Sequence, residues 1–119
     1  MIQGLRTAIY TVTDLEAAKE WYSKVLGAAP YFDEPFYAGF NVEGFELGLM
    51  PVDHAPDAGG VLTYWGVEDA HAAFKRLLRL GATKHQPVMD VGGGIQVASV
   101  FDPFGNIFGV IYNPNFQAA

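Results

Sequence analysis

The sequence predicts an α+β fold in which a β-α-β-β-β module occurs twice in tandem. Two observations support this class. Each half of the chain has a strand-like run, then one amphipathic helical segment, then three further strand-like runs. Each half also contains two apolar strands joined by a tight turn, at 40–49 and at 100–113. We expect a single domain, 1–119, with module one at about 1–52, a linker at about 53–60 and module two at about 61–116.

The first module opens with a strand at Leu5–Val12, which is rich in β-branched and aromatic residues. Thr13 and Glu16 fit a capping box, with Thr13 as the N-cap of a helix that Gly27 ends. Apolar residues recur in this helix at helical spacing and predict its buried stripe: Leu15, Ala18, Tyr22, Val25 and Leu26. Turns at Glu34-Pro35 and Glu43-Gly44 then separate three predicted strands: 28–32, 36–42 and 45–50.

The second module repeats this order. A strand at Val61–Val67 precedes a helix at Asp69–Leu80, which Gly81 ends. The apolar residues of that helix are predicted to face inward: Ala70, Ala73, Phe74, Leu77 and Leu78. Three strands follow, at 83–89, 95–101 and 107–112. We expect curved mixed sheets with the helices on their outer faces and a concave cup, which is the natural place for a ligand.

The turn between the last two strands has a structural explanation in its own residues. Pro103 presets the backbone for a turn, and Gly105 permits a positive φ. Asp102 can accept hydrogen bonds from the N–H groups of this turn. We therefore interpret Asp102 as a structural residue.

Composition excludes several functions. The chain has a net charge of −6, which makes nucleic acid an improbable partner because phosphate binding needs a basic surface. It has no cysteine, so disulfide and thiolate chemistry are excluded. No apolar run is long enough to span a membrane, and the N-terminus lacks the pattern of a signal peptide. The expected location is the cytoplasm, and no membrane partner is predicted.

Three motifs in this order resemble the vicinal oxygen chelate superfamily of glyoxalases, bleomycin resistance proteins and extradiol dioxygenases. They are Val12-x-Asp14-Leu15, Trp21-Tyr22-x-x-Val25-Leu26-Gly27 and Asp102-Pro103-x-Gly105-Asn106. The resemblance extends over nearly the whole chain, from Leu5 to Asn113. It implies the paired β-α-β-β-β fold, a homodimer, and a site in the cup formed by two modules.

The resemblance also implies positions for the metal ligands of the superfamily's enzymes. Counting along the strands places these positions at Thr7, Glu46, Leu62 and Gly109. Only Glu46 is a good ligand, whereas a catalytic metal takes about three protein ligands. We therefore predict no metal site and no cofactor.

Glu46 is the candidate functional residue. Strand alternation places it on the same face as Gly48 and Met50, opposite Leu47 and Leu49. If the two leucines face the helix, Glu46 points into the cup, where it could bind a cation or act as a general base with a raised pKa. The alternative, weighed evenly, is a solvated glutamate. Further cup residues predicted by parity are Thr7, Ile9, Met50, Leu62, Tyr64, Ile111 and Asn113.

Three functions remain open. The first is a metal-independent small-molecule binding protein that resembles bleomycin resistance proteins. It would sequester a bulky, often cationic ligand. The second is a glyoxalase-like lyase or isomerase with Glu46 as its base. The third is a structural or regulatory dimer without a ligand. The absence of histidine from the first strands favours the first and third.

Overall fold

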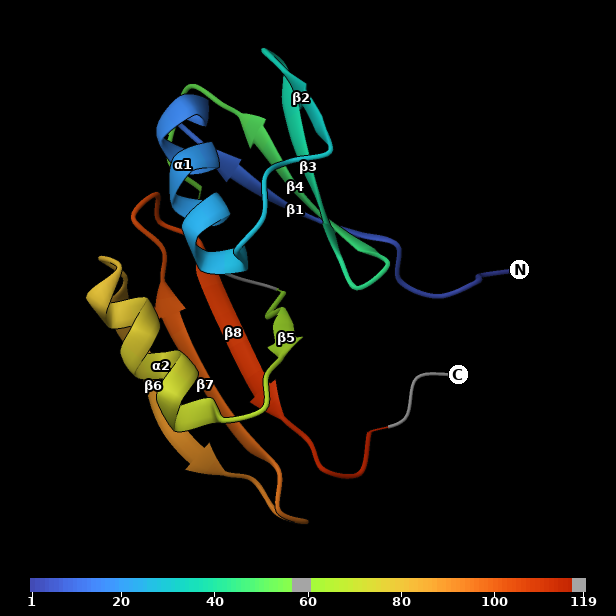
Figure 1. Ribbon diagram of the computed structural model, residues 1–119, viewed down its shortest axis with the longest axis vertical. Helices are drawn as coiled ribbons and strands as arrows, with labels where there is room; N and C mark the ends of the chain where they lie inside the picture. The colour runs from blue at the N-terminus through green and yellow to red at the C-terminus, as the bar shows by residue number, and fades with distance from the viewer. Residues whose placement is uncertain (57–60, 117–119) are drawn as a thin grey trace. The chain divides into compact units, whose positions relative to one another are not determined.

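Each half of the chain folds into one four-stranded mixed sheet with one helix, in the predicted β-α-β-β-β order (Figure 1). The computed structural model describes residues 1–56 and 61–116. The chain divides into two compact units, Met1–Asp57 and Ala58–Ala119. Part of the predicted linker, 57–60, lies outside the described residues. The predicted α+β class with two tandem modules is confirmed.

The first unit has its strands in the spatial order β1-β4-β3-β2. Strand β1 is parallel to β4, and the other two pairs are antiparallel. The elements are β1 (Thr7–Val12), α1 (Leu15–Leu26), β2 (Phe32–Glu34), β3 (Tyr37–Val42) and β4 (Phe45–Pro51). Helix α1 packs on β3 and β4, so one face of the sheet is covered and the other is open.

Alternate residues of these strands point toward α1 and form the core of the first unit. Leu47 and Leu49 of β4 and Phe40 of β3 are fully buried on the side of α1. Tyr10 of β1 stacks on Tyr22 of α1, with ring centroids 5.9 Å apart. The residues between these positions therefore belong to the open face of the sheet.

Two local predictions in the first unit are wrong. The N-cap of α1 is Asp14 and not Thr13, because the Asp14 side chain accepts a hydrogen bond from the N–H of Ala17. A carboxylate at this position also interacts favourably with the positive end of the helix dipole. The strand predicted at 28–32 forms instead at Phe32–Glu34, because these three residues pair with β3.

The second unit repeats the arrangement with the order β5-β8-β7-β6, and α2 packs on β6, β7 and β8. Its elements are β5 (Tyr64–Gly66), α2 (Ala70–Arg79), β6 (Thr83–Asp90), β7 (Gln96–Phe101) and β8 (Ile107–Tyr112). The strand predicted at 61–67 is shorter than expected, because only three of its residues pair with β8. Leu78 was predicted to face inward but is 36% exposed, whereas its neighbour Leu77 is buried.

The turn before β8 is held by a buried carboxylate. Asp102 is 4% exposed and accepts hydrogen bonds from the N–H groups of Phe104 and Asn106, at 2.9 and 2.8 Å. The side-chain amide of Asn106 donates a third hydrogen bond, at 3.1 Å. The structural interpretation of Asp102 is therefore confirmed.

A membrane-spanning helix needs about 20 consecutive, mostly apolar residues. None of the helices in residues 1–56 and 61–116 is both long and apolar enough to cross a bilayer.

Candidate ligand-binding site

Glu46 lies on the open face of the first sheet, as alternation predicts. Strand register places it directly between Thr7 of β1 and Asn41 of β3. The three side chains thus form a polar row across three adjacent strands, on the face opposite α1. The hairpin next to this row turns at Glu43 and Gly44, which have φ values of 50° and 90°. The Asn41 side chain accepts a hydrogen bond from the N–H of Gly44 and so fixes this turn.

Two tyrosine hydroxyls hold the Glu46 carboxylate. Tyr31, in the segment before β2, donates to Oε1, and Tyr37, at the start of β3, donates to Oε2 at 2.6 Å. Tyr31 is 65% exposed, whereas Tyr37 is partly buried. We call these three residues the tyrosine–carboxylate clamp. The clamp determines the direction of the Glu46 side chain from both of its oxygens.

Glycines make the room that the clamp requires. A Cβ atom at Gly48 would lie 1.9 Å from the hydroxyl oxygen of Tyr37, so the ring occupies the space above this glycine. A Cβ atom at Gly39 would lie 3.0 Å from Oε1 of Glu46. Gly39 and Gly48 are also direct partners in the register of β3 and β4. The missing side chains therefore leave a depression on the open face in which the clamp lies.

The clamp shifts the protonation equilibria of its members. The hydrogen bonds donated by Tyr31 and then Tyr37 lower the pKa of Glu46 below the ordinary value of a glutamate. The pKa of Tyr37 is raised, first by burial and then by its hydrogen bond to Glu46, and that of Tyr31 is raised by its hydrogen bond to Glu46. Glu46 is therefore ionised and both phenols are protonated at neutral pH. A lowered pKa is the opposite of what a general base at neutral pH needs.

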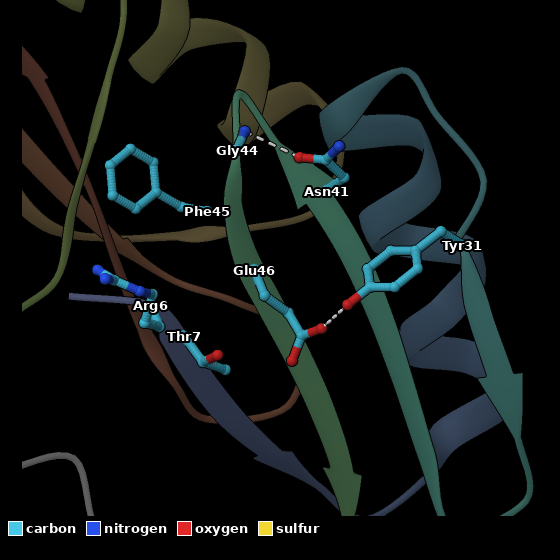
Figure 2. Close-up of a pocket in the computed structure, with 7 residues that line it drawn as sticks. All are labelled: Arg6, Thr7, Tyr31, Asn41, Gly44, Phe45 and Glu46. Carbon is cyan, nitrogen blue, oxygen red and sulfur yellow. Dashed lines mark hydrogen bonds between the residues drawn. The ribbon is translucent and has the colours of Figure 1, made fainter. Parts of the chain in front are cut away.

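A pocket of about 350 Å³ opens beside the clamp (Figure 2). Figure 2 shows the Tyr31 hydroxyl pointing at the carboxylate of Glu46, with Thr7 and Arg6 on the opposite side of that carboxylate. The lining combines a carboxylate, a guanidinium, polar groups and two aromatic rings: Arg6, Thr7, Tyr31, Asn41, Gly44, Phe45 and Glu46. Such a mixture of aromatic surface with a few polar groups is typical of small-molecule sites.

The other predicted site residues are divided between the two units. Ile9 and Met50 share the open face with Glu46 but do not line its pocket, and they are 52% and 39% exposed. In the second unit, Leu62 and Tyr64 are 42% and 39% exposed. Ile111 pairs with Gly66, and the side chain of Asn113 accepts a hydrogen bond from the N–H of Asn115.

The positions implied for a metal ion do not fit one. Glu46 offers one carboxylate, but Gly109 has no side-chain donor atom. In the register of the second unit Gly109 pairs with Tyr64, so Tyr64 and not Leu62 occupies the place that Thr7 has opposite Glu46. Within the described residues, no group of three or more His, Cys, Asp or Glu side chains is arranged to hold a metal.

The sequence prediction missed Tyr31, Tyr37, Arg6 and Phe45. Tyr37 could have been found by parity, because it alternates along β3 with Gly39 and Asn41. Tyr31 lies outside any strand, and its backbone N–H donates to the carbonyl of Gly39. No periodic signal marks such a residue.

Comparison with known protein families agrees with this fold. A model of the Glyoxalase/Bleomycin resistance protein/Dioxygenase superfamily matches residues 4–110. The chain therefore belongs to this superfamily, as the resemblance to vicinal oxygen chelate proteins implied.

Individual relatives add detail. The cadmium-induced protein CadI of Mycobacterium tuberculosis (strain ATCC 25618 / H37Rv) is 34% identical over 82 residues, which are 65% of this chain and 53% of CadI. The chain thus spans about half the length of the curated relatives it matches.

Solved structures show the same fold. A glyoxalase-related enzyme from Fulvimarina pelagi has a TM-score of 0.81 at 23% identity, over 99% of this chain and 94% of that one. A glyoxalase / bleomycin resistance protein from Catenulispora acidiphila DSM 44928 has a TM-score of 0.70 at 26% identity, over 93% of this chain and 100% of that one.

Proposed function

We propose that this protein binds a bulky small molecule without a metal ion and holds a cationic group of that ligand against Glu46. One observation carries the proposal: an ionised carboxylate, held from both oxygens by phenols, faces a pocket with aromatic walls. Carboxylates and aromatic faces both attract ammonium groups. The lowered pKa of Glu46 supports charge-based binding over general-base catalysis by a lyase or isomerase.

The relatives support this proposal only at the level of the superfamily, which includes bleomycin resistance proteins. The name of CadI concerns induction by cadmium. This chain has no cysteine, whose thiolate is the ligand that soft metals prefer. We therefore do not extend a role in cadmium binding to it.

The direct test is Glu46→Gln, which keeps the shape of the side chain and removes its charge. We expect the affinity for benzylamine and phenethylamine, measured by calorimetry, to fall by about tenfold or more, since charge-assisted hydrogen bonds contribute about 1.5–3 kcal/mol. The matched control is Glu43→Gln, because Glu43 is exposed in the adjacent hairpin and does not line the pocket. Binding to the unchanged protein should persist below the ordinary pKa of a glutamate, because the pKa of Glu46 is lowered.

Two results would contradict the proposal. One is that neither amine binds to the unchanged protein at millimolar concentration. The other is that an amine binds equally well to Glu46→Gln, which would make Glu46 a solvated residue of the sheet face.

The proposal also predicts that the purified protein contains no stoichiometric divalent metal. The reason is the poor donor set at the positions that the superfamily's enzymes use, Gly109 above all. Elemental analysis after purification without chelators measures this directly. One tightly bound zinc, nickel, manganese or iron ion per chain would show that a donor set has been overlooked.

We further propose that the protein is a homodimer. Apolar side chains are exposed in both units, including Ile9 at 52% and Leu62 at 42%, and exposed apolar area commonly marks an interface. Light scattering coupled to size-exclusion chromatography should give twice the mass of the 12.9 kDa chain. A monomer mass throughout the micromolar range would reject the dimer and leave the ligand proposal unaffected.

A further inference from the structure

Arg6 places a positive charge in the same pocket as the negative charge of Glu46. The backbone carbonyl of Arg6 accepts a hydrogen bond from the N–H of Glu46 at 2.9 Å, so the two residues are joined at the start of β1 and β4. Both side chains line the pocket of about 350 Å³. In the view of Figure 2, Arg6 and Tyr31 lie on opposite sides of Glu46.

The two charges do not neutralise each other. The salt bridges among the described residues involve Lys19 and Lys24, and Arg6 forms none. Within residues 1–56 and 61–116, the Arg6 guanidinium donates two hydrogen bonds, both from Nη1, to the carbonyls of Gln3 and Leu5 at 3.0 and 3.3 Å. The Nε and Nη2 hydrogens are therefore available to a ligand.

Two further groups line the same pocket. Thr7 follows Arg6 in the chain and is the register partner of Glu46, and in the view of Figure 2 its side chain lies between the two. The Phe45 ring is 44% exposed and offers apolar surface in the same lining. A ligand in this pocket would thus meet a guanidinium, a carboxylate, a hydroxyl and an aromatic ring.

We infer that the ligand class is a zwitterion that carries an ammonium group and a carboxylate on an apolar frame, as an aromatic amino acid does. The ammonium pairs with Glu46 and the carboxylate with Arg6, whose planar guanidinium suits carboxylates. A ligand that is only cationic would place its charge near Arg6 without compensation, and one that is only anionic would face Glu46. This inference rests on the proposed function, because it needs Glu46 to bind the ammonium group.

The test uses matched pairs of an amine and a zwitterion in calorimetry. The pairs are benzylamine with 4-(aminomethyl)benzoate and phenethylamine with phenylalanine. The two zwitterions differ in the distance between their ammonium and carboxylate groups. We expect at least one zwitterion to bind about tenfold more tightly than its amine, the gain of one charge-assisted contact. In Arg6→Gln that advantage should disappear, so that the ratio of the two affinities approaches one.

Arg79→Gln is the matched control, since Arg79 is an exposed arginine on α2 in the other unit. Thermal melts of both variants establish that they are folded. The inference is overturned if neither zwitterion binds more tightly than its amine, or if the advantage survives in Arg6→Gln. If the amines bind in a Glu46-dependent way without any such advantage, the inference alone fails. If no probe binds, the proposed function fails with it.

Discussion

Replacing Asp102 with alanine is expected to lower the free energy of unfolding by about 3 kcal/mol, the largest effect we predict for a single side chain. The carboxylate is 4% exposed and accepts hydrogen bonds from two backbone N–H groups and the Asn106 amide. Alanine leaves these donors without their acceptor at a buried turn. Chemical denaturation followed by circular dichroism measures the change, and the melting temperature should fall by about 10 °C or more.

The control for this prediction is Asp90→Ala. Asp90 also accepts a hydrogen bond from the backbone of a turn, from the N–H of Gly92 at 2.8 Å, but it is exposed. Its loss should change stability by less than about 1 kcal/mol. Equal effects of the two substitutions would show that burial of Asp102 does not matter to the turn.

Replacing Gly109 with alanine should destabilise the second unit by about 2–3 kcal/mol, because the new methyl group has no room. Its Cβ would lie 2.5 Å from the backbone oxygen of Thr63 and 2.7 Å from the Tyr64 ring. The Thr63 oxygen accepts the hydrogen bond of the Gly109 N–H and cannot move without weakening the pairing of β5 with β8. Denaturant unfolding of the variant measures the loss.

Gly66→Ala is the matched control in the same pair of strands. A Cβ atom at Gly66 meets nothing within 4 Å, and its φ lies outside the left-handed region. We expect this variant to be unchanged or slightly more stable, since alanine restricts the unfolded chain. If Gly109→Ala is as stable as Gly66→Ala, the close contact between β5 and β8 is not maintained in solution.

Prediction from sequence succeeded where a local residue pattern is compatible with only one local structure. Alternation in β4 could place Leu47 and Leu49 only against the helix, and this choice put Glu46 on the open face. The turn at Asp102 followed equally from its own residues. Prediction was weaker at element boundaries, as with the N-cap at Asp14, because two adjacent residues both had suitable side chains.

The sequence also predicts a poor donor set at the positions implied for metal ligands. Gly109, at a position implied for a metal ligand, has no side chain, and no folding can supply a donor atom there. The structure also shows what stabilises the negative charge of the remaining carboxylate, Glu46. Two phenols from different segments donate hydrogen bonds to Glu46 and so stabilise its charged form.

By itself, therefore, the sequence determined the two β-α-β-β-β modules, the face on which Glu46 lies and the lack of a side-chain donor at Gly109, since these depend on residue type and strand period. Only the tertiary structure decided the partners of Glu46. Tyr31 lies 15 residues before Glu46, outside any strand, and Tyr37 lies 9 before it. Strand alternation gives the face of Tyr37 but not its contact with Glu46. They meet because β3 pairs with β4 and because Gly39 and Gly48 leave space above the sheet. The protonation state of the site depends on those contacts, because a carboxylate takes its pKa from the groups that surround it.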